Sequence, residues 1–508
     1  MKVQDFLSHH GITQNPFSEE DAQTDPVFKD RCIDMAFHPA WDKIFGRPSD
    51  PSTSIVFGEK GSGKTALRLQ TEKHIEKFNA DNPHARCFVV SYDDFNPFLD
   101  EFAERVGRRH RKPEKVLADF QLWDHIDAIL SVAVTKLLNG LFRTRGAKDS
   151  EDPDAMPADF RKRLTRHQRR DLMLLAAFYD NSTSAPLPAR WKRLQRRLHG
   201  WSFASWWPFL LGLSITVLTL VGSVYGWWTL RQQDPPGTVP NWMIWLGGAV
   251  LVGSWIPWCT RRLARWWLAL TVKKHIRVFP RHAWPLSVTL MNLPNSELRG
   301  QPMPNKNRTD DRYRLLAKLQ SILESLDFAG MTVLVDRVDE PHLINGSADA
   351  MKALLWPMFD NKFLKLPGLG IKFMLPSELT QFIDREDRDF YQRARLDKQN
   401  MIPSLNWTGQ ALYDLANARI AACSSRQPPN KLSALLEESI TEPRLFDALQ
   451  SLRVPRHMFR FLYRLIVSHC NQYSDDAPDW EVDDARFQSE LALYRREQDA
   501  ADRGLASG

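Results

Sequence analysis

The chain has little cysteine, and what it has is scattered. Its five cysteines, among 508 residues, include no CxxC or CxxxH spacing. A disulfide framework and a structural zinc site are therefore not expected, whereas a reducing compartment is. The first residues, MKVQDFLSHHGITQNPF, lack the apolar stretch of a cleavable secretory signal. Repeats and low-complexity tracts are also missing, so nothing indicates a protein-binding array.

Two long stretches in the middle of the chain, 201–230 and 235–260, contain no charged residue. A helix over 209–230 would be about 33 Å long, enough for a hydrocarbon core of about 30 Å, whereas the second span, 242–259, is shorter. Most of the 18 tryptophans lie near the ends of these stretches, as in the aromatic belts of membrane proteins. We predict a two-helix transmembrane hairpin within 201–267. The alternative is a pair of helices buried in a large soluble core.

Lysine and arginine cluster on both sides of the predicted hairpin, while the turn between the spans has only Arg231. The clusters are Arg190, Lys192, Arg193, Arg196 and Arg197 before it, and Arg261, Arg262, Arg265, Lys273 and Lys274 after it. By the positive-inside rule both flanks, and with them both termini, are cytoplasmic. We therefore expect a two-span protein of the inner or plasma membrane, whose basic flanks also suit anionic lipid headgroups.

Residues 58–65, GEKGSGKT, match the phosphate-binding motif GxxxxGK followed by Ser or Thr. The glycines let the backbone wrap around phosphates, and successive N–H groups then form an anion nest. We expect Lys64 to reach the β- and γ-phosphates of ATP, and the Thr65 hydroxyl to bind Mg²⁺. A short apolar strand precedes the motif and a helical sequence follows it. The candidate nucleotide-binding residues of the loop are Gly58, Gly61, Ser62, Gly63, Lys64 and Thr65.

A second candidate motif, MTVLVDRVDEPH at 331–342, is an apolar strand that ends in carboxylates. Asp336 lies at the carboxyl end of the strand, where ligands of open α/β sheets collect, and is the second candidate for holding Mg²⁺. Asp339 and Glu340 follow closely enough to position or deprotonate a water at the γ-phosphate, and are candidate catalytic residues. The alternative is a carboxylate-rich surface turn.

Other apolar runs at 85–95, 368–379 and 400–407 read as further strands. Ser377 and Glu378 end the second of these, either as a γ-phosphate sensor or as a capped helix start. Strands that alternate with helices predict an α/β fold with a parallel sheet, here that of a P-loop NTPase, followed by a helical C-terminal domain.

The two motifs belong to one predicted sheet but are separated by far more chain than a crossover needs. The hairpin is therefore an insertion within the nucleotide-binding domain rather than an appended anchor. The predicted domains are an N-terminal segment, the first part of the core with a helical insertion, the hairpin, the second part of the core, and a helical lid. Their ranges are 1–50, 51–200, 201–267, 268–408 and 409–508.

This order of elements resembles the KAP family of P-loop NTPases, in which membrane helices are inserted between Walker A and Walker B. The resemblance covers roughly 50–410 and rests on the element order and the two motifs. It departs at 335–340, VDRVDE, which is more similar to the hhhhDxxDE of NACHT and other STAND ATPases than to the paired aspartates usual in KAP proteins. The resemblance implies a STAND- or AAA-like ATPase with KAP as the nearest layout. Some KAP members are linked to phage exclusion, so signalling or defence are implied processes.

Two arginine positions follow from the AAA-like resemblance. Arg456, after Pro455 at a predicted helix start, resembles the sensor-2 arginine of the helical lid, although Pro in a first helical turn is also ordinary. Arg393 and Arg395 end the helical sequence before the last strand, where related ATPases place an arginine that completes a neighbouring subunit's site. This implies a homo-oligomer. The alternative is that both are solvated cations at a helix end.

The leading prediction is thus a membrane-anchored ATP hydrolase that binds Mg-ATP on the cytoplasmic side and uses hydrolysis as a conformational switch, with an unidentified protein partner. A second reading is an ATP-binding scaffold that does not hydrolyse, which has no need of the three carboxylates after the strand. A transporter is disfavoured because two spans make a thin permeation path. The basic run at 105–115 would suit nucleic acid, but a solvated helix face is the commoner meaning.

Overall fold

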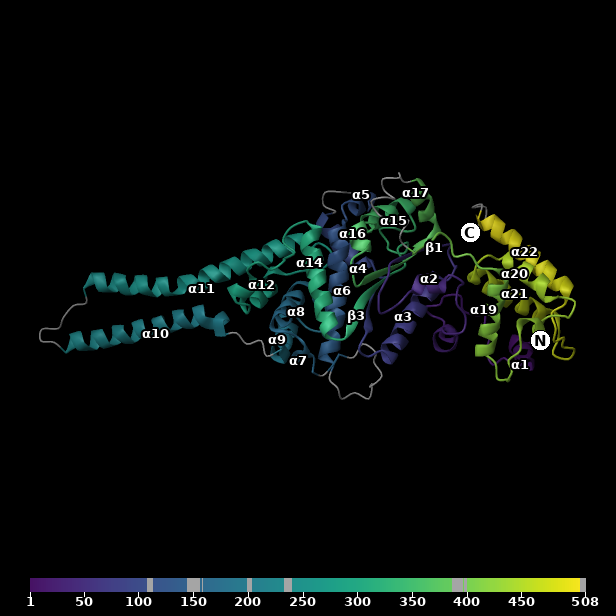
Figure 1. Ribbon diagram of the computed structural model, residues 1–508, viewed down its shortest axis with the longest axis horizontal. Coiled ribbons are helices and arrows are strands. Elements are labelled where there is room, and N and C mark those ends of the chain that lie inside the picture. The colour runs from purple at the N-terminus through teal and green to yellow at the C-terminus, as the bar shows by residue number, and fades with distance from the viewer. Residues whose placement is uncertain are drawn as a thin grey trace. The chain divides into compact units, whose positions relative to one another are not determined.

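The computed structural model describes residues 1–106, 113–143, 156–157, 159–198, 203–232, 240–385, 396 and 400–502. These residues form an α/β protein with a five-stranded, all-parallel sheet and mostly helical content (Figure 1). The chain divides into two compact units, one of residues 1–95 with 328–508 and the other of residues 96–327. The α/β class predicted from alternating strands and helices is therefore confirmed.

The sheet lies in the first unit, and its order is β2-β3-β4-β1-β5. The strands are β1 (Ser54–Gly58), β2 (Arg86–Tyr92), β3 (Phe328–Val335), β4 (Leu369–Pro376) and β5 (Asn400–Ile402). Nearly every residue of β1 to β4 is buried, as expected for apolar, β-branched runs covered on both faces. All five runs that the sequence predicted as strands are strands.

The carboxyl ends of the central strands meet at one edge of the sheet. Gly58 at the end of β1 pairs with Pro376 of β4, and Val335 at the end of β3 pairs with Phe373. The glycine-rich loop after β1 leads into helix α3 (Lys64–Asp81), and the carboxylate segment follows β3. The fold thus brings two distant sequence motifs to the edge where open α/β sheets bind ligands.

Helices from the two ends of the chain share one apolar core in the first unit. The N-terminal helix α1 (Val3–His9) and the turn Phe28–Cys32 pack with the C-terminal helices. Those helices are α19 (Gly409–Ala422), α20 (Glu442–Gln450), α21 (Pro455–Gln472) and α22 (Asp484–Asp502). Arg419 of α19 pairs with Asp25 at 2.5 Å, with both side chains buried. The shorter helices of this unit are α2 (Trp41–Phe45), α15 (Ala348–Leu355), α16 (Asn361–Leu364) and α17 (Thr380–Arg385).

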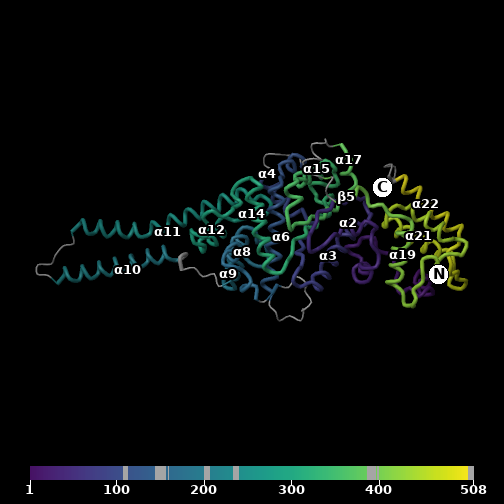
Figure 2. The backbone as a smooth tube through the Cα atoms, viewed as in Figure 1, coloured from purple at the N-terminus to yellow at the C-terminus, as the bar shows by residue number. Residues whose placement is uncertain are grey.

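The described part of the second unit is helical, as the backbone trace shows (Figure 2). Its body contains α4 (Asn96–Val106), α5 (Pro113–Ala118), α6 (Leu122–Phe142), α7 (Phe160–Arg163), α8 (Arg166–Tyr179), α9 (Leu187–Leu198), α12 (Ala283–Met291), α13 (Asn295–Leu298) and α14 (Thr309–Ser325). Helix α6 is apolar along most of its length and largely buried, and it packs against α8 and α14. It forms the centre of this unit.

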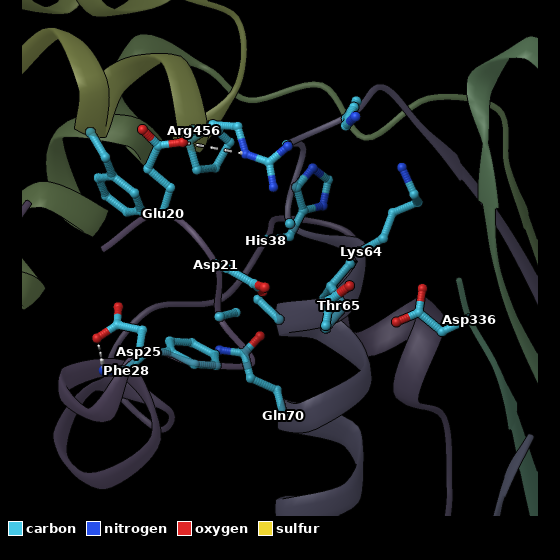
Figure 3. Close-up of a pocket in the computed structure, with 18 of the residues that line it drawn as sticks. Glu20, Asp21, Asp25, Phe28, His38, Lys64, Thr65, Gln70, Asp336 and Arg456 are labelled. Atoms are coloured by element: carbon cyan, nitrogen blue, oxygen red, sulfur yellow. Dashed lines mark hydrogen bonds and ion pairs between the residues drawn. The ribbon is translucent and has the colours of Figure 1, made fainter. Parts of the chain in front are cut away.

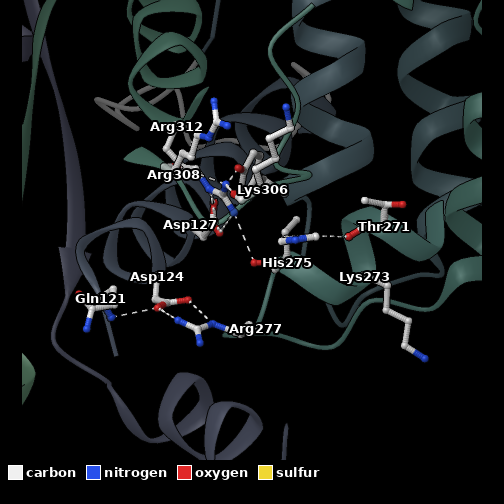
Figure 4. A network of polar contacts seen from close by, with 12 residues as sticks. Gln121, Asp124, Asp127, Thr271, Lys273, His275, Arg277, Lys306, Arg308 and Arg312 are labelled. Carbon is white, nitrogen blue, oxygen red and sulfur yellow. Dashed lines mark hydrogen bonds and ion pairs between the residues drawn. The ribbon is translucent and has the colours of Figure 1, made fainter. Parts of the chain in front are cut away.

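Buried ion pairs tie α6 to later parts of the chain (Figure 4). Arg312 of α14 donates to both carboxylate oxygens of Asp127, with Nη2 3.1 Å from Oδ2, and neither side chain is exposed. The Tyr179 hydroxyl donates to the same carboxylate at 2.8 Å. One turn earlier on α6, Asp124 pairs with Arg277. Burial raises the pKa of Asp127, and the Arg312 guanidinium opposes that shift.

Helices α10 (Phe203–Arg231) and α11 (Asn241–His275) are long, apolar and lie side by side (Figures 1 and 2). Three described helices are long and apolar enough to cross a membrane, namely these two and α6. In the most apolar window of α6, 72% is buried, against 6% in each of the other two. The sequence predicted only the exposed pair. Trp255 of α11 donates to the Thr216 hydroxyl of α10 at 3.0 Å, which joins the two helices.

Candidate functional site

A pocket in the first unit lies at the carboxyl edge of the sheet (Figure 3). It is lined by the glycine-rich loop, the segment after β3, an N-terminal stretch and the helix α21. Eight of the residues singled out from the sequence line it: Gly61, Gly63, Lys64, Thr65, Asp336, Asp339, Glu340 and Arg456. Gly58 and Ser62 belong to the same loop but are not among the lining residues. Arg393 and Arg395 lie outside the described residues.

The loop requires glycine at two positions for backbone reasons. Gly61 and Gly63 have φ of 88° and 96°, a left-handed region that other residues seldom adopt. A Cβ on Gly61 would also lie 2.6 Å from Cβ of Arg456, whose backbone N–H donates to the Gly61 carbonyl at 3.3 Å. Gly63 is the N-cap of α3, so the loop delivers its backbone to the positive end of that helix.

Around the buried side of the loop, Ser62 and Trp407 hold its shape. The Trp407 indole donates to the Ser62 carbonyl at 2.9 Å, and a Cβ on Gly58 would lie 2.3 Å from the Ser62 hydroxyl oxygen. That hydroxyl is buried and finds no hydrogen-bond partner among the described residues. Ser62 therefore supports the loop on its buried side, where it contacts Trp407 and packs against Gly58.

Lys64 points back onto its own loop in this conformation. Its Nζ donates to the Gly58 carbonyl at 2.7 Å and to the Glu59 carbonyl at 3.0 Å. Burial lowers the pKa of Lys64, and the carboxylates of Asp339 and Asp336 oppose that shift. The ammonium group is therefore held at the mouth of the loop, with negative side chains of the pocket nearby.

Asp336 is deeply buried, with 1% of the residue exposed, as little as Asp25 elsewhere in the pocket wall. Burial raises its pKa, while Arg68, the Arg337 N–H, a hydrogen bond from the Thr65 hydroxyl, and Lys64 all oppose that shift. Arg68 Nε lies 3.3 Å from Oδ2 without forming a hydrogen bond. Within the described residues Oδ2 has no hydrogen-bond donor, so this oxygen remains able to accept from a ligand in the pocket.

Oxygen ligands beside an unsatisfied carboxylate fit Mg²⁺, which keeps several waters and takes few protein ligands. The Thr65 hydroxyl and Asp336 supply that kind of set. No group of three or more His, Cys, Asp or Glu residues that could hold a metal ion occurs in the described ranges. A metal at this pocket would therefore depend on a bound ligand, such as phosphate oxygens, to complete its coordination.

Arg68 is a site residue that the sequence did not indicate. It lies four residues after Lys64 on α3, is buried, and joins two carboxylates from different strands. Its Nη1 is 2.9 Å from Oδ2 of Asp93, just after β2, and its Nε faces Asp336 after β3. No local pattern marks such a residue, because its partners are distant in the sequence.

Glu340 lines the pocket but is engaged by a neighbour. Its carboxylate pairs with Arg337 at 2.5 Å, and half of the side chain is exposed. Arg337 has a left-handed φ of 58° and also donates to the Gln23 side chain at 2.9 Å. The turn after β3 is therefore strained and cross-linked to the N-terminal stretch. Asp339 is partly buried and lines the same pocket.

The N-terminal stretch forms a wall of the pocket that the sequence analysis did not foresee. Figure 3 shows Glu20, Asp21 and Phe28 on the side opposite Asp336. Glu20 Oε2 lies 3.9 Å from Arg456 Nε, and its Oε1 lies 2.6 Å from Arg460 Nε. The remaining wall is more apolar, and its members include Cys32, Ala36, Ala66, Leu415 and Phe459. The pocket wall away from the loop therefore mixes charged and apolar side chains.

The sequence left two interpretations open for Ser377, Glu378 and Arg456. Glu378 lines the pocket, whereas Ser377 begins the short helix Ser377–Leu379 without a side-chain cap. Arg456 is the second residue of α21, with Val454 as the N-cap and Pro455 first, and its guanidinium faces the pocket.

Comparisons with protein-family models, with curated proteins and with solved structures find no match to this chain.

Proposed function

We propose that the pocket binds Mg-ATP and that the chain is a membrane-anchored ATPase. The observation that carries the proposal is one constellation within a single pocket. It contains a left-handed glycine loop opening a helix, Lys64 at its mouth, and Asp336 with an unsatisfied oxygen beside Thr65. Backbone N–H groups at a helix N-terminus, with a lysine, are the usual means of holding polyphosphate.

Each residue then has a defined task. The loop N–H groups hold phosphate oxygens, and Lys64 exchanges its two carbonyl acceptors for phosphate oxygens of higher charge. Thr65 and Asp336 hold Mg²⁺, directly and through water, and Arg68 keeps the Asp336 carboxylate oriented. A bound Mg²⁺ would neutralise charge on the β- and γ-phosphates. Apolar side chains of the pocket wall, such as Phe28 and Phe459, suit the base.

Hydrolysis requires a group that orients or deprotonates water, and Asp339 and Glu340 are the candidates. Because Glu340 is paired with Arg337, it must exchange that partner before it can act on a water. Arg456 is placed to meet the phosphate end from α21 if its contact with Glu20 opens. A homo-oligomer in which Arg393 or Arg395 reaches a neighbouring site remains part of the proposal.

The membrane part of the proposal assigns α10 and α11 to two spans, with both flanks on the cytoplasmic side. Their outward side chains are large and apolar, among them Leu218 at 70% exposed. An apolar surface that covers two long helices is typical of contact with lipid rather than with water. Carbonate extraction of membranes should leave the chain in the pellet. Leu218→Lys should reduce insertion, since a lysine at mid-span costs roughly 3 kcal/mol.

One observation favours the scaffold reading, namely the ion pair between Arg337 and Glu340. This pair engages a candidate catalytic carboxylate that would otherwise be able to act on a water. Turnover of ATP by the chain in lipid nanodiscs separates the two readings. The hydrolase reading predicts that Glu340→Gln binds ATP normally and loses most turnover. The exposed Glu438→Gln should turn over like the unmodified chain. If the unmodified chain binds ATP without turnover, the scaffold reading replaces the hydrolase. Turnover that is unchanged in Glu340→Gln would instead remove Glu340 from the catalytic residues.

A further inference from the structure

The outward face of α11 stays apolar beyond the point where the charge-free sequence ends. Val252, Ile256, Leu263 and Trp267 recur at helical spacing, and each is more than half exposed. Trp266, beside them, is 37% exposed. The first charged residue of α11 is Arg261, so this stripe continues for almost two turns past the predicted end of the span.

Two of the three arginines in this region do not face outward. Arg261 and Arg265 are buried, with Nη2 atoms 2.9 Å and 3.2 Å from the Leu293 carbonyl. Arg265 also donates to the Asn295 side chain at 2.5 Å. Arg262 is exposed and lies over the Trp258 ring, 5.1 Å from its centroid. Arg261 and Arg265 therefore do not mark a water boundary on the outward face of α11.

The pairing of α10 with α11 sets the depth of this face. Phe209 of α10 contacts Trp255 and Trp258 of α11, with ring centroids 5.8 Å and 6.4 Å apart, so Trp207 is level with about Thr260. Trp207 and Trp227 are about 30 Å apart along α10, the thickness of a hydrocarbon core. Leu263 to Trp267 then lie about 5 to 10 Å beyond its inner edge, and helical side chains lean back toward the N-terminus, here toward the core.

We propose that this face, formed by Leu263, Trp266 and Trp267 and here called the interfacial face, lies in the headgroup layer of the cytoplasmic leaflet. The inference rests on the proposed membrane hairpin. Tryptophan suits that layer because its ring is apolar while its N–H remains hydrated. The exposed cations Arg262, Lys273 and Lys274 bracket the face and match anionic phosphates.

A second copy of the chain is the competing occupant. A two-fold contact through this face would bring Arg262 opposite itself or opposite Lys273 of the other copy, and like charges in contact oppose association. Anionic lipid meets no such repulsion. The charge pattern therefore favours the bilayer.

Spin labels measure the depth directly. In nanodiscs containing phosphatidylserine, and in a Cys259→Ser background that removes the exposed cysteine, single labels are placed by Leu263→Cys and Trp267→Cys. Both native side chains are more than half exposed, so a label needs no repacking. Val252→Cys is the control within the span and Lys274→Cys the control beyond it. Collision rates with oxygen, relative to a water-soluble nickel chelate, report depth.

At Leu263 and Trp267 the ratio of oxygen to nickel collisions should be severalfold higher than at Lys274 and lower than at Val252. Ratios equal to that of Lys274 would place the face in water and overturn the inference while leaving the hairpin intact. Loss of both collisions, with dipolar broadening between labels, would assign the face to a second copy. A water-like ratio at Val252 would remove the hairpin, and the interfacial face with it.

Discussion

Asp127 in the second unit and Asp336 in the first are both buried aspartates that face an arginine. Asp127 receives hydrogen bonds from Arg312 on both oxygens and another from Tyr179. Asp336 lies beside Arg68 without a hydrogen bond, and its Oδ2 has no donor among the described residues. The Asp127 cluster is satisfied by the protein itself. The Asp336 cluster lines a pocket and leaves one carboxylate oxygen without a donor from the described residues.

The two clusters differ in a property that separates a structural ion pair from a candidate binding site. Burial raises the pKa of both carboxyl groups, so burial and charge alone do not distinguish them. The difference is that one oxygen of Asp336 has no hydrogen-bond donor in the part of the chain that the structure describes. The glycine-rich loop, Lys64 and the Thr65 hydroxyl also lie nearby, and together they suit one kind of ligand. Substitutions in the two clusters should therefore act on different properties, stability in one and binding in the other.

The largest effect on stability is expected in the Asp127 cluster, whose hydrogen bonds are all made within the protein. Asp127→Ala leaves the Arg312 guanidinium buried without its partner, which should lower the unfolding free energy by about 3–5 kcal/mol. The double variant Asp127→Leu with Arg312→Met removes both charges and should recover much of that loss. Denaturant unfolding in detergent measures both. Wild-type stability in Asp127→Ala would show that the Asp127–Arg312 pair does not stabilise the fold.

Removing the arginine of the Asp336 cluster should lower the unfolding free energy by less. Arg68→Met leaves Asp336 and Asp93 without their cation. Asp336 lines the pocket and Asp93 is partly exposed, so both carboxylates can be hydrated, and we expect a loss of about 1–3 kcal/mol. Arg312→Met is the matched substitution in the Asp127 cluster, and the same unfolding assay compares the two variants. An equal or greater loss in Arg68→Met would erase the distinction.

A smaller effect on energy, but a specific one, is expected from Asp336→Asn. The variant keeps the size of the side chain and should unfold near the wild-type midpoint, because no hydrogen bond to Oδ2 is lost and Arg68 keeps its ion pair with Asp93. The apparent affinity for Mg²⁺ in ATP binding should fall by about tenfold. Titration of Mg²⁺ against a fixed concentration of ATP measures this. Unchanged dependence on Mg²⁺ would remove Asp336 from the metal site.

The loop and the strands were accessible from sequence because their signals are local. A glycine loop needs its glycines at fixed spacing, so the positions of Gly61, Gly63 and Lys64 could be predicted, and the apolar run before Asp336 predicted a buried strand. Arg68 carries no such signal, since its partners follow β2 and β3 and meet it only after the sheet has formed.

The N-terminal wall of the pocket was not foreseen for a similar reason. Asp25 is held by Arg419, almost the whole chain away, and no local spacing records that contact. Apolar helices show the same limit. The most apolar windows of helices α6 and α11 have equal mean hydropathy, yet one window is buried in protein and the other is exposed. The aspartates on α6, Asp124 and Asp127, mark it as a protein core helix only once Arg277 and Arg312 are known to meet them.

The central claim is that the glycine-rich loop binds the phosphates of ATP, and equilibrium binding of a fluorescent ATP analogue with Mg²⁺ tests it most directly. Lys64 contributes charged hydrogen bonds to the phosphates, so Lys64→Ala should weaken binding by at least about tenfold. Lys77→Ala, an exposed lysine on the same helix, should bind like the wild type, and both variants should unfold at the wild-type midpoint. Wild-type affinity in a folded Lys64→Ala chain would contradict the claim.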